Sequence, residues 1–279
     1  MPLPPHAAPA VPSRTWTRTF LPRPAARLRL FCFHSAGGGP SMYRDWPTRL
    51  PADVEVVGVQ LPGRETSIGE PWLTDYTEVV EQLHAALRPQ LDRPYALFGH
   101  SMGALLAYGV ALAARRCGDR PPERLLVSGS AGPGSGPDEP DRTDRADRIN
   151  RADWSDAELV EDLRSMGGTP EEVLANRELL GLILPTLRAD YAVCRTFRRP
   201  DGPPLDCPVS VLGGLEDTVS PDALHRWSHA TRATTTVRTF PGGHFFLTGE
   251  SAGAVLGAVS EDLAAQPAQP AQPAQPLGM

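Results

Sequence analysis

A serine between two glycines stands where an apolar, strand-like run changes into a helical one, in the stretch Tyr95-Ala-Leu-Phe-Gly-His-Ser-Met-Gly-Ala104. A sharp strand-to-helix turn of this kind lifts the serine hydroxyl above the sheet, at the start of a helix whose free N–H groups favour negative charge. Gly99 and Gly103 leave room for the turn. We therefore predict Ser101 as a nucleophile and the N–H of Met102 as one of two donors in an oxyanion hole.

A serine hydroxyl needs a base that takes its proton, and the sequence contains seven histidines. His244 follows a β-like run in the glycine-flanked loop Phe-Pro-Gly-Gly-His-Phe-Phe, late in the chain, where sites of this kind receive their base. The alternative for His244 is a packed structural histidine. Five others lie near the N-terminus, in predicted helices or within the serine motif: His6, His84, His225, His229 and His100. We predict His244 as the general base.

The base in turn needs an acid that orients it and stabilises its cation. The predicted strand 208–213 leads into Gly-Leu-Glu-Asp-Thr-Val-Ser, which places Glu216 and Asp217 on a loop at the same edge of the sheet as the serine. The earlier predicted strand 124–129 is followed by no acid before Asp138. Asp217 and Glu216 are therefore both candidates for the acid; if Asp217 is the acid, Glu216 is a solvated loop carboxylate.

The second oxyanion donor is expected in the loop after the first predicted strand, Phe33-His-Ser-Ala-Gly-Gly-Gly39. Its glycines allow the backbone to approach a substrate closely, and the N–H of Ala36 is the candidate donor. The loop lacks the Gly-Lys-Ser/Thr and Gly-x-Gly-x-x-Gly patterns of phosphate-binding loops.

Alternating strands and helices must position these residues. Short, nearly continuous apolar runs are typical of strands covered on both faces of a parallel sheet. Asp75–Leu91 is predicted as an amphipathic helix, and Met102–Cys117 as a buried helix that ends at Gly118. The alternation indicates a doubly wound α/β fold. The predicted strands cover residues 28–33, 54–60, 95–99, 124–129, 208–213 and 235–240.

One segment interrupts this alternation. Residues 132–140 are rich in glycine and proline, a charged stretch follows, and residues 155–199 have a helical pattern. We interpret residues 132–205 as a helical lid inserted into a core of residues 27–131 and 206–263, with a purely structural excursion as the alternative. A proline-rich leader (1–26) and a tail that repeats Ala-Gln-Pro (264–279) are expected to be disordered.

Composition excludes several other classes of protein. The net charge of -6 argues against a partner that is a nucleic acid or an anionic membrane. No run approaches the ~18 apolar residues that cross a bilayer, and no signal peptide is recognisable, so a cytoplasmic location is expected. The four scattered cysteines form neither a disulfide framework nor a zinc site. We expect no metal and no cofactor.

Five stretches together resemble the type II (stand-alone, editing) thioesterases of polyketide and nonribosomal peptide synthesis. The resemblance covers about residues 28–263, and Gln60-Leu-Pro-Gly-Arg-Glu65 is its most family-specific element. One departure is visible, because many relatives have Pro-His where this chain has His34-Ser35. The other stretches are Phe-His-Ser-Ala-Gly-Gly, Leu-Phe-Gly-His-Ser-Met-Gly-Ala, Gly-Leu-Glu-Asp and Gly-Gly-His-Phe-Phe-Leu.

The resemblance implies an α/β-hydrolase fold with a mostly parallel central sheet flanked by helices. It implies a triad of Ser101, Asp217 and His244, with oxyanion N–H groups from Ala36 and Met102. The implied substrate is an acyl thioester on the phosphopantetheine arm of an acyl or peptidyl carrier protein, and a monomeric enzyme is expected. A product-releasing thioesterase or a general carboxylesterase of the same fold is the alternative, and a non-catalytic binder of acyl carriers is a third possibility.

Overall fold

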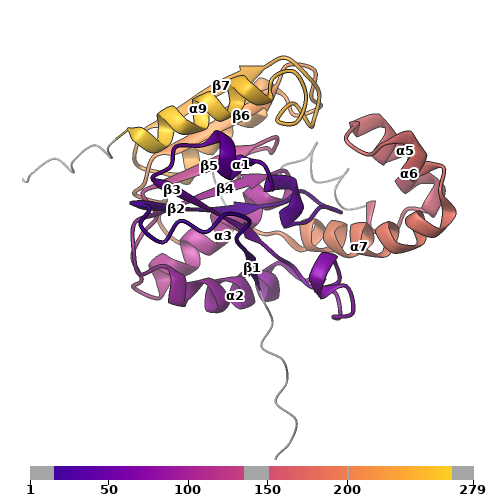
Figure 1. The fold of residues 1–279 in the computed structure, drawn as a ribbon, viewed down its shortest axis with the longest axis horizontal. Coiled ribbons are helices and arrows are strands. Elements are labelled where there is room, and N and C mark those ends of the chain that lie inside the picture. The colour runs from indigo at the N-terminus through magenta and orange to yellow at the C-terminus, as the bar shows by residue number, and fades with distance from the viewer. Residues whose placement is uncertain (1–15, 135–150, 200, 266–279) are drawn as a thin grey trace, which may run out of the picture.

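The computed structural model describes residues 16–134, 151–199 and 201–265. In these residues a seven-stranded sheet has the order β1-β3-β2-β4-β5-β6-β7, and every pairing is parallel except that of β1 with β3. Figure 1 shows the sheet between two layers of helices. The strands are β1 (Thr17–Arg18), β2 (Leu28–Phe33), β3 (Val54–Val59), β4 (Tyr95–His100), β5 (Arg124–Ser128), β6 (Val209–Gly214) and β7 (Thr235–Phe240).

The apolar core is divided in two by the sheet. Successive side chains of a strand point to opposite faces, so Phe31 and Leu97 pack on one face while Leu30 and Phe98 pack on the other. Helices α2 (Tyr76–Leu87) and α3 (Met102–Arg116) cover the first face. Helices α1 (Trp46–Arg49) and α9 (Ala252–Ala264) cover the second. Burial on both faces explains why the central strands read as unbroken apolar runs.

The covering helices have recognisable ends. Asp75 caps α2 by accepting a hydrogen bond from the N–H of Glu78, at 3.0 Å. Helix α3 is buried along almost its whole length and is followed by Gly118, whose φ of +69° suits a helix end. Short helical turns complete the chain between the larger elements: η1 (Pro40–Tyr43), η2 (Glu65–Ser67), η3 (Arg88–Gln90), α8 (Pro221–His225) and η4 (Arg226–Ala230).

Between β5 and β6 the described chain forms a separate helical group, α5 (Asp156–Met166), α6 (Glu171–Leu174) and α7 (Arg177–Thr196), which we call the helical insertion. Its helices share an apolar cluster of their own, which includes Leu159 and Leu187. Figure 1 shows α5 and α6 away from the sheet, while α7 leads back to it. The end of α7 is attached to α2, where Thr196 Oγ1 accepts a hydrogen bond from the N–H of Tyr76.

The predicted strands and the two predicted long helices are confirmed, with ends that differ by a few residues. The expectation of a disordered leader up to residue 26 is wrong for residues 16–26. Thr17 and Arg18 pair with Val59 and Gly58, and the carbonyl of Trp16 accepts a hydrogen bond from the N–H of Gln60. Residues 1–15, the tail from 266 and the segment 135–150 lie outside the described residues. Within the described residues, no helix combines the length and apolar character needed to cross a membrane.

Candidate active site

Ser101 occupies the turn between β4 and α3 with φ 56° and ψ -118°, a conformation that L-residues rarely adopt. The turn brings two backbone segments close together at each flanking glycine, which is possible because glycine has no side chain. A Cβ atom on Gly99 would lie 2.1 Å from the carbonyl oxygen of Gly103, and one on Gly103 would lie 2.1 Å from that of Phe33. The pattern Gly-x-Ser-x-Gly is therefore required by packing at both glycines.

His244 and Asp217 come together from two neighbouring loops, one after β7 and one after β6. The Nδ1 atom of His244 lies 3.0 and 3.1 Å from the two carboxylate oxygens of Asp217. Burial opposes ionisation of this carboxyl group, but the hydrogen bond and charge of His244, with the N–H groups of Val219 and Thr218, hold its pKa below the ordinary value. Asp217 is thus an anion that can orient the imidazole and stabilise its cation.

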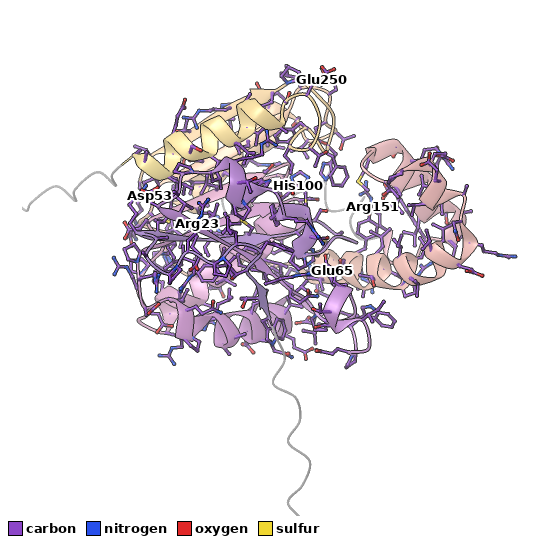
Figure 2. The ribbon with its side chains drawn as sticks, in the orientation of Figure 1. Arg23, Asp53, Glu65, His100, Arg151 and Glu250 are labelled. Atoms are coloured by element: carbon purple, nitrogen blue, oxygen red, sulfur yellow. The ribbon has the colours of Figure 1, made fainter. Side chains whose placement is uncertain are left out.

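Ser101 and His244 line the same cavity, of about 130 Å³, at the carboxyl edge of the sheet. Within the described residues no hydrogen bond joins their side chains; such contacts are often long before substrate binds. The helical insertion forms part of the wall, and Figure 2 shows Arg151 between the sheet and the insertion. Further lining residues include Leu105, Met166, Tyr191, Cys194, Val219 and Phe245.

Both predicted oxyanion donors also line this cavity. Met102 is the first residue of α3, so its N–H has no acceptor within the helix. Ala36 lies in a turn that the N–H of Gly38 closes by donating to the carbonyl of Ser35, at 3.0 Å. The cavity thus brings together a hydroxyl, an imidazole and two backbone donors, a combination suited to acyl transfer.

The alternatives to these residues have other contacts. Glu216 is exposed, and its carboxylate accepts a hydrogen bond from the N–H of Gly242; it makes no hydrogen bond with His244 within the described residues. His84 is paired with Asp119, at 2.8 Å. His225 and His229 are exposed on α8 and η4, as expected, and His6 lies outside the described residues.

His100 lies beside the candidate base, with 5.0 Å between the two ring centroids. It is fully buried, and its Nδ1 lies 3.0 Å from Ser128 Oγ. Burial, and then the positive charge that His244 can carry, lower the pKa of His100 well below its ordinary value. His100 is therefore a neutral ring that packs beneath the site and is not a second base.

One group of possible metal ligands occurs among the described residues, namely His84, Cys117 and Asp119. The Nε atom of Arg88 lies 3.0 Å from Asp119, so a cation already neutralises this carboxylate. We assign no metal to this group, which is distant in the fold from the cavity because it lies at the far ends of α2 and α3.

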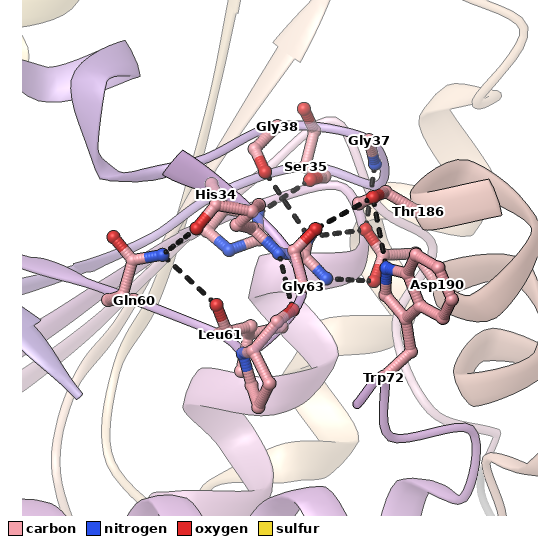
Figure 3. A network of polar contacts seen from close by, with 12 residues as sticks. His34, Ser35, Gly37, Gly38, Gln60, Leu61, Gly63, Trp72, Thr186 and Asp190 are labelled. Atoms are coloured by element: carbon pink, nitrogen blue, oxygen red, sulfur yellow. Dashed lines mark hydrogen bonds and ion pairs between the residues drawn. The ribbon is translucent and has the colours of Figure 1, made fainter. Parts of the chain in front are cut away.

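Sequence reasoning missed a buried polar network beside the cavity. Figure 3 shows that it joins the loop after β2, the Gln60–Glu65 stretch and helix α7. At its centre the guanidinium of Arg64 is paired with the carboxylate of Asp190. The family-specific Gln60–Glu65 stretch was the available signal, but nothing in the sequence indicated its partner.

Comparison with known proteins gives consistent matches over the described fold. Residues 28–263 match the family model of the thioesterase domain. The chain is 37% identical to the gramicidin S biosynthesis protein GrsT of Aneurinibacillus migulanus over 80% of this chain and 84% of that protein. The family-model match includes the stretches that carry Ser101, Asp217 and His244.

Two solved structures are also similar. RedJ, a thioesterase from the prodiginine biosynthetic pathway in Streptomyces coelicolor, superimposes with a TM-score of 0.77 at 37% identity, covering 93% of this chain and 91% of that one. BorB, the type II thioesterase from the borrelidin biosynthetic cluster, gives a TM-score of 0.75 at 38% identity, with coverage of 89% and 97%. The similarity thus extends through the helical insertion as well as the sheet.

Proposed function

Because the chain belongs to the thioesterase family, we propose that it hydrolyses aberrant or stalled acyl groups from the phosphopantetheine arm of acyl or peptidyl carrier proteins. It acts as a stand-alone enzyme in polyketide or nonribosomal peptide biosynthesis, the setting that the names of its relatives support. The observation that carries the proposal is the cavity in which Ser101, His244, Ala36 and Met102 meet. The proposal includes a monomer in the cytoplasm and a reaction without a cofactor of the enzyme.

In the proposed reaction Ser101 Oγ attacks the thioester carbonyl while His244 takes the hydroxyl proton. The carbonyl oxygen becomes an oxyanion that accepts hydrogen bonds from the N–H groups of Ala36 and Met102. The C–S bond then breaks, the pantetheine thiol leaves with the proton from His244, and the acyl group remains as an ester on Ser101. Water, deprotonated by His244, attacks this ester, and His244 then returns the proton to Ser101 Oγ as the C–O bond breaks, which releases a carboxylic acid and the free serine.

Asp217 supports both steps through His244. Its carboxylate, held as an anion, fixes the ring so that Nδ1 carries a proton and Nε2 is the basic nitrogen. Each oxyanion donor in such sites is typically worth about 3–4 kcal/mol of transition-state stabilisation.

We propose in addition that the helical insertion is a lid that forms part of the acyl chamber. Three side chains of the insertion line the cavity, Met166, Tyr191 and Cys194, together with Arg151 just before α5. A lid should exchange its amide hydrogens faster than the strands do, and protease should cut it first. Exchange as slow as that of β4 and β5 would contradict gating by this segment.

The function is tested with carrier proteins loaded with acetyl, propionyl and longer acyl groups. The purified enzyme should release them, and Ser101→Ala should abolish both release and labelling of the serine by a fluorophosphonate. Release that persists in Ser101→Ala would overturn the assignment of the nucleophile.

A second measurement separates the proposed function from its alternatives. An editing thioesterase should have a higher kcat/KM for the carrier-bound thioester than for a free ester of the same acyl group. Equal values would identify a general carboxylesterase, and activity only toward a mature product chain would identify a product-releasing enzyme. If the fluorophosphonate does not label the wild-type protein, the chain is a non-catalytic binder.

A further inference from the structure

Arg64 and Asp190 form a buried, two-point ion pair between the Gln60–Glu65 stretch and helix α7. Arg64 Nη1 lies 2.7 Å from Asp190 Oδ2, and Nη2 lies 2.8 Å from Oδ1. The side chains are only 7% and 1% exposed. Parallel N–H···O bonds of this kind fix the relative orientation of the two groups as well as their distance.

Both side chains also hold the turn that contains Ala36 (Figure 3). Asp190 Oδ2 accepts a hydrogen bond from the N–H of Gly37, at 2.8 Å. Arg64 Nη1 donates a second hydrogen bond to the carbonyl of Gly38, at 3.2 Å. The ion pair is therefore bonded to the two residues that directly follow the candidate oxyanion donor.

The turn determines the direction of the Ala36 N–H. The carbonyl of Ser35 points into the turn, where it accepts the N–H of Gly38 and lies 2.8 Å from His34 Nδ1. The C=O and N–H groups of a planar trans peptide point in opposite directions. The N–H of Ala36, which belongs to the same peptide, therefore points out of the turn, and Ala36 lines the cavity.

We propose that Arg64 and Asp190 are positioning residues. They hold the turn of residues 35–38, which we call the oxyanion turn, in its active conformation and make that conformation depend on the docking of α7. The inference rests on the proposed function, because it assigns a task to residues around the same oxyanion hole. When α7 separates from this turn, Asp190 leaves with it, and the turn loses the acceptor for Gly37 and the counter-charge of Arg64.

The packing of α7 supports this dependence. Gly37 has φ +71°, and a Cβ atom on it would lie 3.2 Å from Leu187 Cδ1. Thr186 Oγ1 donates to the carbonyl of Gly63 and accepts from Trp72 Nε1, both at 3.1 Å. Helix α7 thus contacts the turn and the Gln60–Glu65 stretch at three successive places, Thr186, Leu187 and Asp190.

The remaining polar residues of the Gln60–Glu65 stretch serve the same arrangement. The Nε2 atom of Gln60 donates to the carbonyl of Arg64, at 2.9 Å, and so closes the stretch on itself. Glu65, which has φ +44°, accepts a hydrogen bond from the N–H of Ser41 just beyond the oxyanion loop. The most family-specific stretch of the sequence is therefore a support for the oxyanion loop.

Stability alone gives little reason for a buried ion pair at this place. The cost of desolvating two charges offsets much of their attraction, and apolar residues of similar volume are often at least as stabilising. An apolar pair could not bond to Gly37 and Gly38, however. The contacts with the turn are what distinguish the ion pair from its apolar substitute.

The test uses the full-length enzyme, p-nitrophenyl propionate as a carrier-free substrate and an alkyl boronic acid, which forms a tetrahedral adduct with an active-site serine. Asp190→Asn retains the volume, but it removes the charge that pairs with Arg64 and replaces one of the two acceptor oxygens by an NH₂ group, which cannot accept from the guanidinium. It should lower kcat about 100-fold, within the range for loss of one oxyanion donor. KM should change less than about threefold, and boronate affinity should fall by the same factor as kcat/KM.

Glu55→Gln is the matched control. Glu55 is paired with Arg29 at 2.9 Å, with side chains 9% and 12% exposed, at the opposite, amino-terminal edge of the sheet. This variant breaks a comparably buried ion pair, and its kcat should stay within about threefold of the wild type. A kcat of Asp190→Asn within about threefold of the wild-type value would overturn the inference. A lower kcat with unchanged boronate affinity would overturn it as well.

A double variant covers the case in which Asp190→Asn fails to fold. Arg64→Met combined with Asp190→Leu leaves no unpaired buried charge and should fold, but it cannot hold Gly37 and Gly38, so kcat should again fall about 100-fold. If the kcat of the double variant lies within threefold of the wild-type value, the pair has no positioning role. Absence of ester turnover and of serine labelling in the wild type would instead contradict the proposed function.

Discussion

Asp217 contacts His244 with both carboxylate oxygens, at 3.0 and 3.1 Å from the same ring nitrogen. A single Nδ1 proton shared between two oxygens holds the ring against tilting in either direction. The side chain of Asp217 is 1% exposed and that of His244 is 12% exposed, so little water competes for the contact. The arrangement leaves Nε2 as the nitrogen that can serve Ser101.

Replacing Asp217 by asparagine should lower kcat by about 10³–10⁴-fold, because an amide can stabilise the wrong tautomer of His244 and carries no charge to balance its cation. Carrier-bound propionyl thioester is the substrate for this measurement. Glu216→Gln retains an acceptor for the N–H of Gly242 and should keep kcat within about threefold. If Glu216→Gln were the more damaging change, the acid would have to be reassigned.

The close approach at Gly103 predicts a large cost for one added methyl group. Gly103→Ala would place Cβ 2.1 Å from the backbone carbonyl of Phe33, and neither segment can move without displacing β2 or α3. The free energy of unfolding should fall by about 3 kcal/mol or more, measured by urea denaturation.

A second glycine provides the control. Gly257 is exposed in α9, and apart from the adjacent backbone of its own helix no heavy atom lies within 4 Å of the position of an added Cβ. Gly257→Ala should raise the free energy of unfolding by about 0.5–1 kcal/mol, because alanine favours a helix. Equal effects of the two substitutions would show that the backbone contact at Gly103 is absent.

The buried side chain of His34 should make the free energy of unfolding depend on pH. Burial, and then the Arg64 cation, lower the pKa of His34 to about 4. Below pH 6.5 the unfolded chain binds a proton at this residue, whereas the folded protein does not until about pH 4, so stability falls as the pH falls through this window. Between pH 7 and pH 5 the loss should be about 2 kcal/mol from His34 alone.

The variant His34→Asn can donate to the carbonyl of Ser35 as the ring does, but it has no group that titrates. Its free energy of unfolding should fall less between pH 7 and pH 5 than that of the wild type, by about 2 kcal/mol. His225→Asn, which replaces an exposed histidine on α8, is the control for the substitution itself. An identical slope in all three proteins would exclude a buried, neutral His34.

The helical insertion supplies part of the cavity wall, so its side chains should limit the length of the acyl group that the cavity accepts. Met166→Ala removes a side chain of the helical insertion from the cavity wall. It should raise kcat/KM for hexanoyl relative to acetyl thioester by about 10-fold, as expected for a few methylenes gained in an apolar pocket. Met42→Ala, on the other face of the sheet, should leave the ratio unchanged. If this ratio of kcat/KM values is unchanged in Met166→Ala, the insertion does not form part of the acyl chamber.

Local sequence signals were sufficient for most of the fold. The central strands are apolar at consecutive positions because both faces of the sheet are covered, and each such run was recognised. Strand β1 was missed because Thr17 and Arg18 have no apolar pattern; their backbone pairs with β3, and their side chains contact Gln90 and Glu65. The strand exists because β3 offers an open edge, a property of the assembled sheet.

The candidate catalytic residues were also predictable, since each carries a local mark. Ser101 stands between two glycines after a strand, His244 lies in a glycine-flanked loop, and Asp217 follows β6. Parallel strands present their carboxyl ends at one edge, so residues far apart in the chain had to meet there. The sequence by itself thus determined the sheet, the edge at which chemistry occurs and the residue types present at it.

Only the tertiary structure decided what supports that edge. Arg64 and Asp190 are 126 residues apart, on a loop and on a helix of the insertion, and neither has a local pattern that indicates a partner. A charge can be buried only where a counter-charge and hydrogen-bond partners are supplied, and these come from the packing of α7 against the oxyanion turn. Their pairing is therefore a consequence of how the elements pack, which no local stretch of sequence encodes.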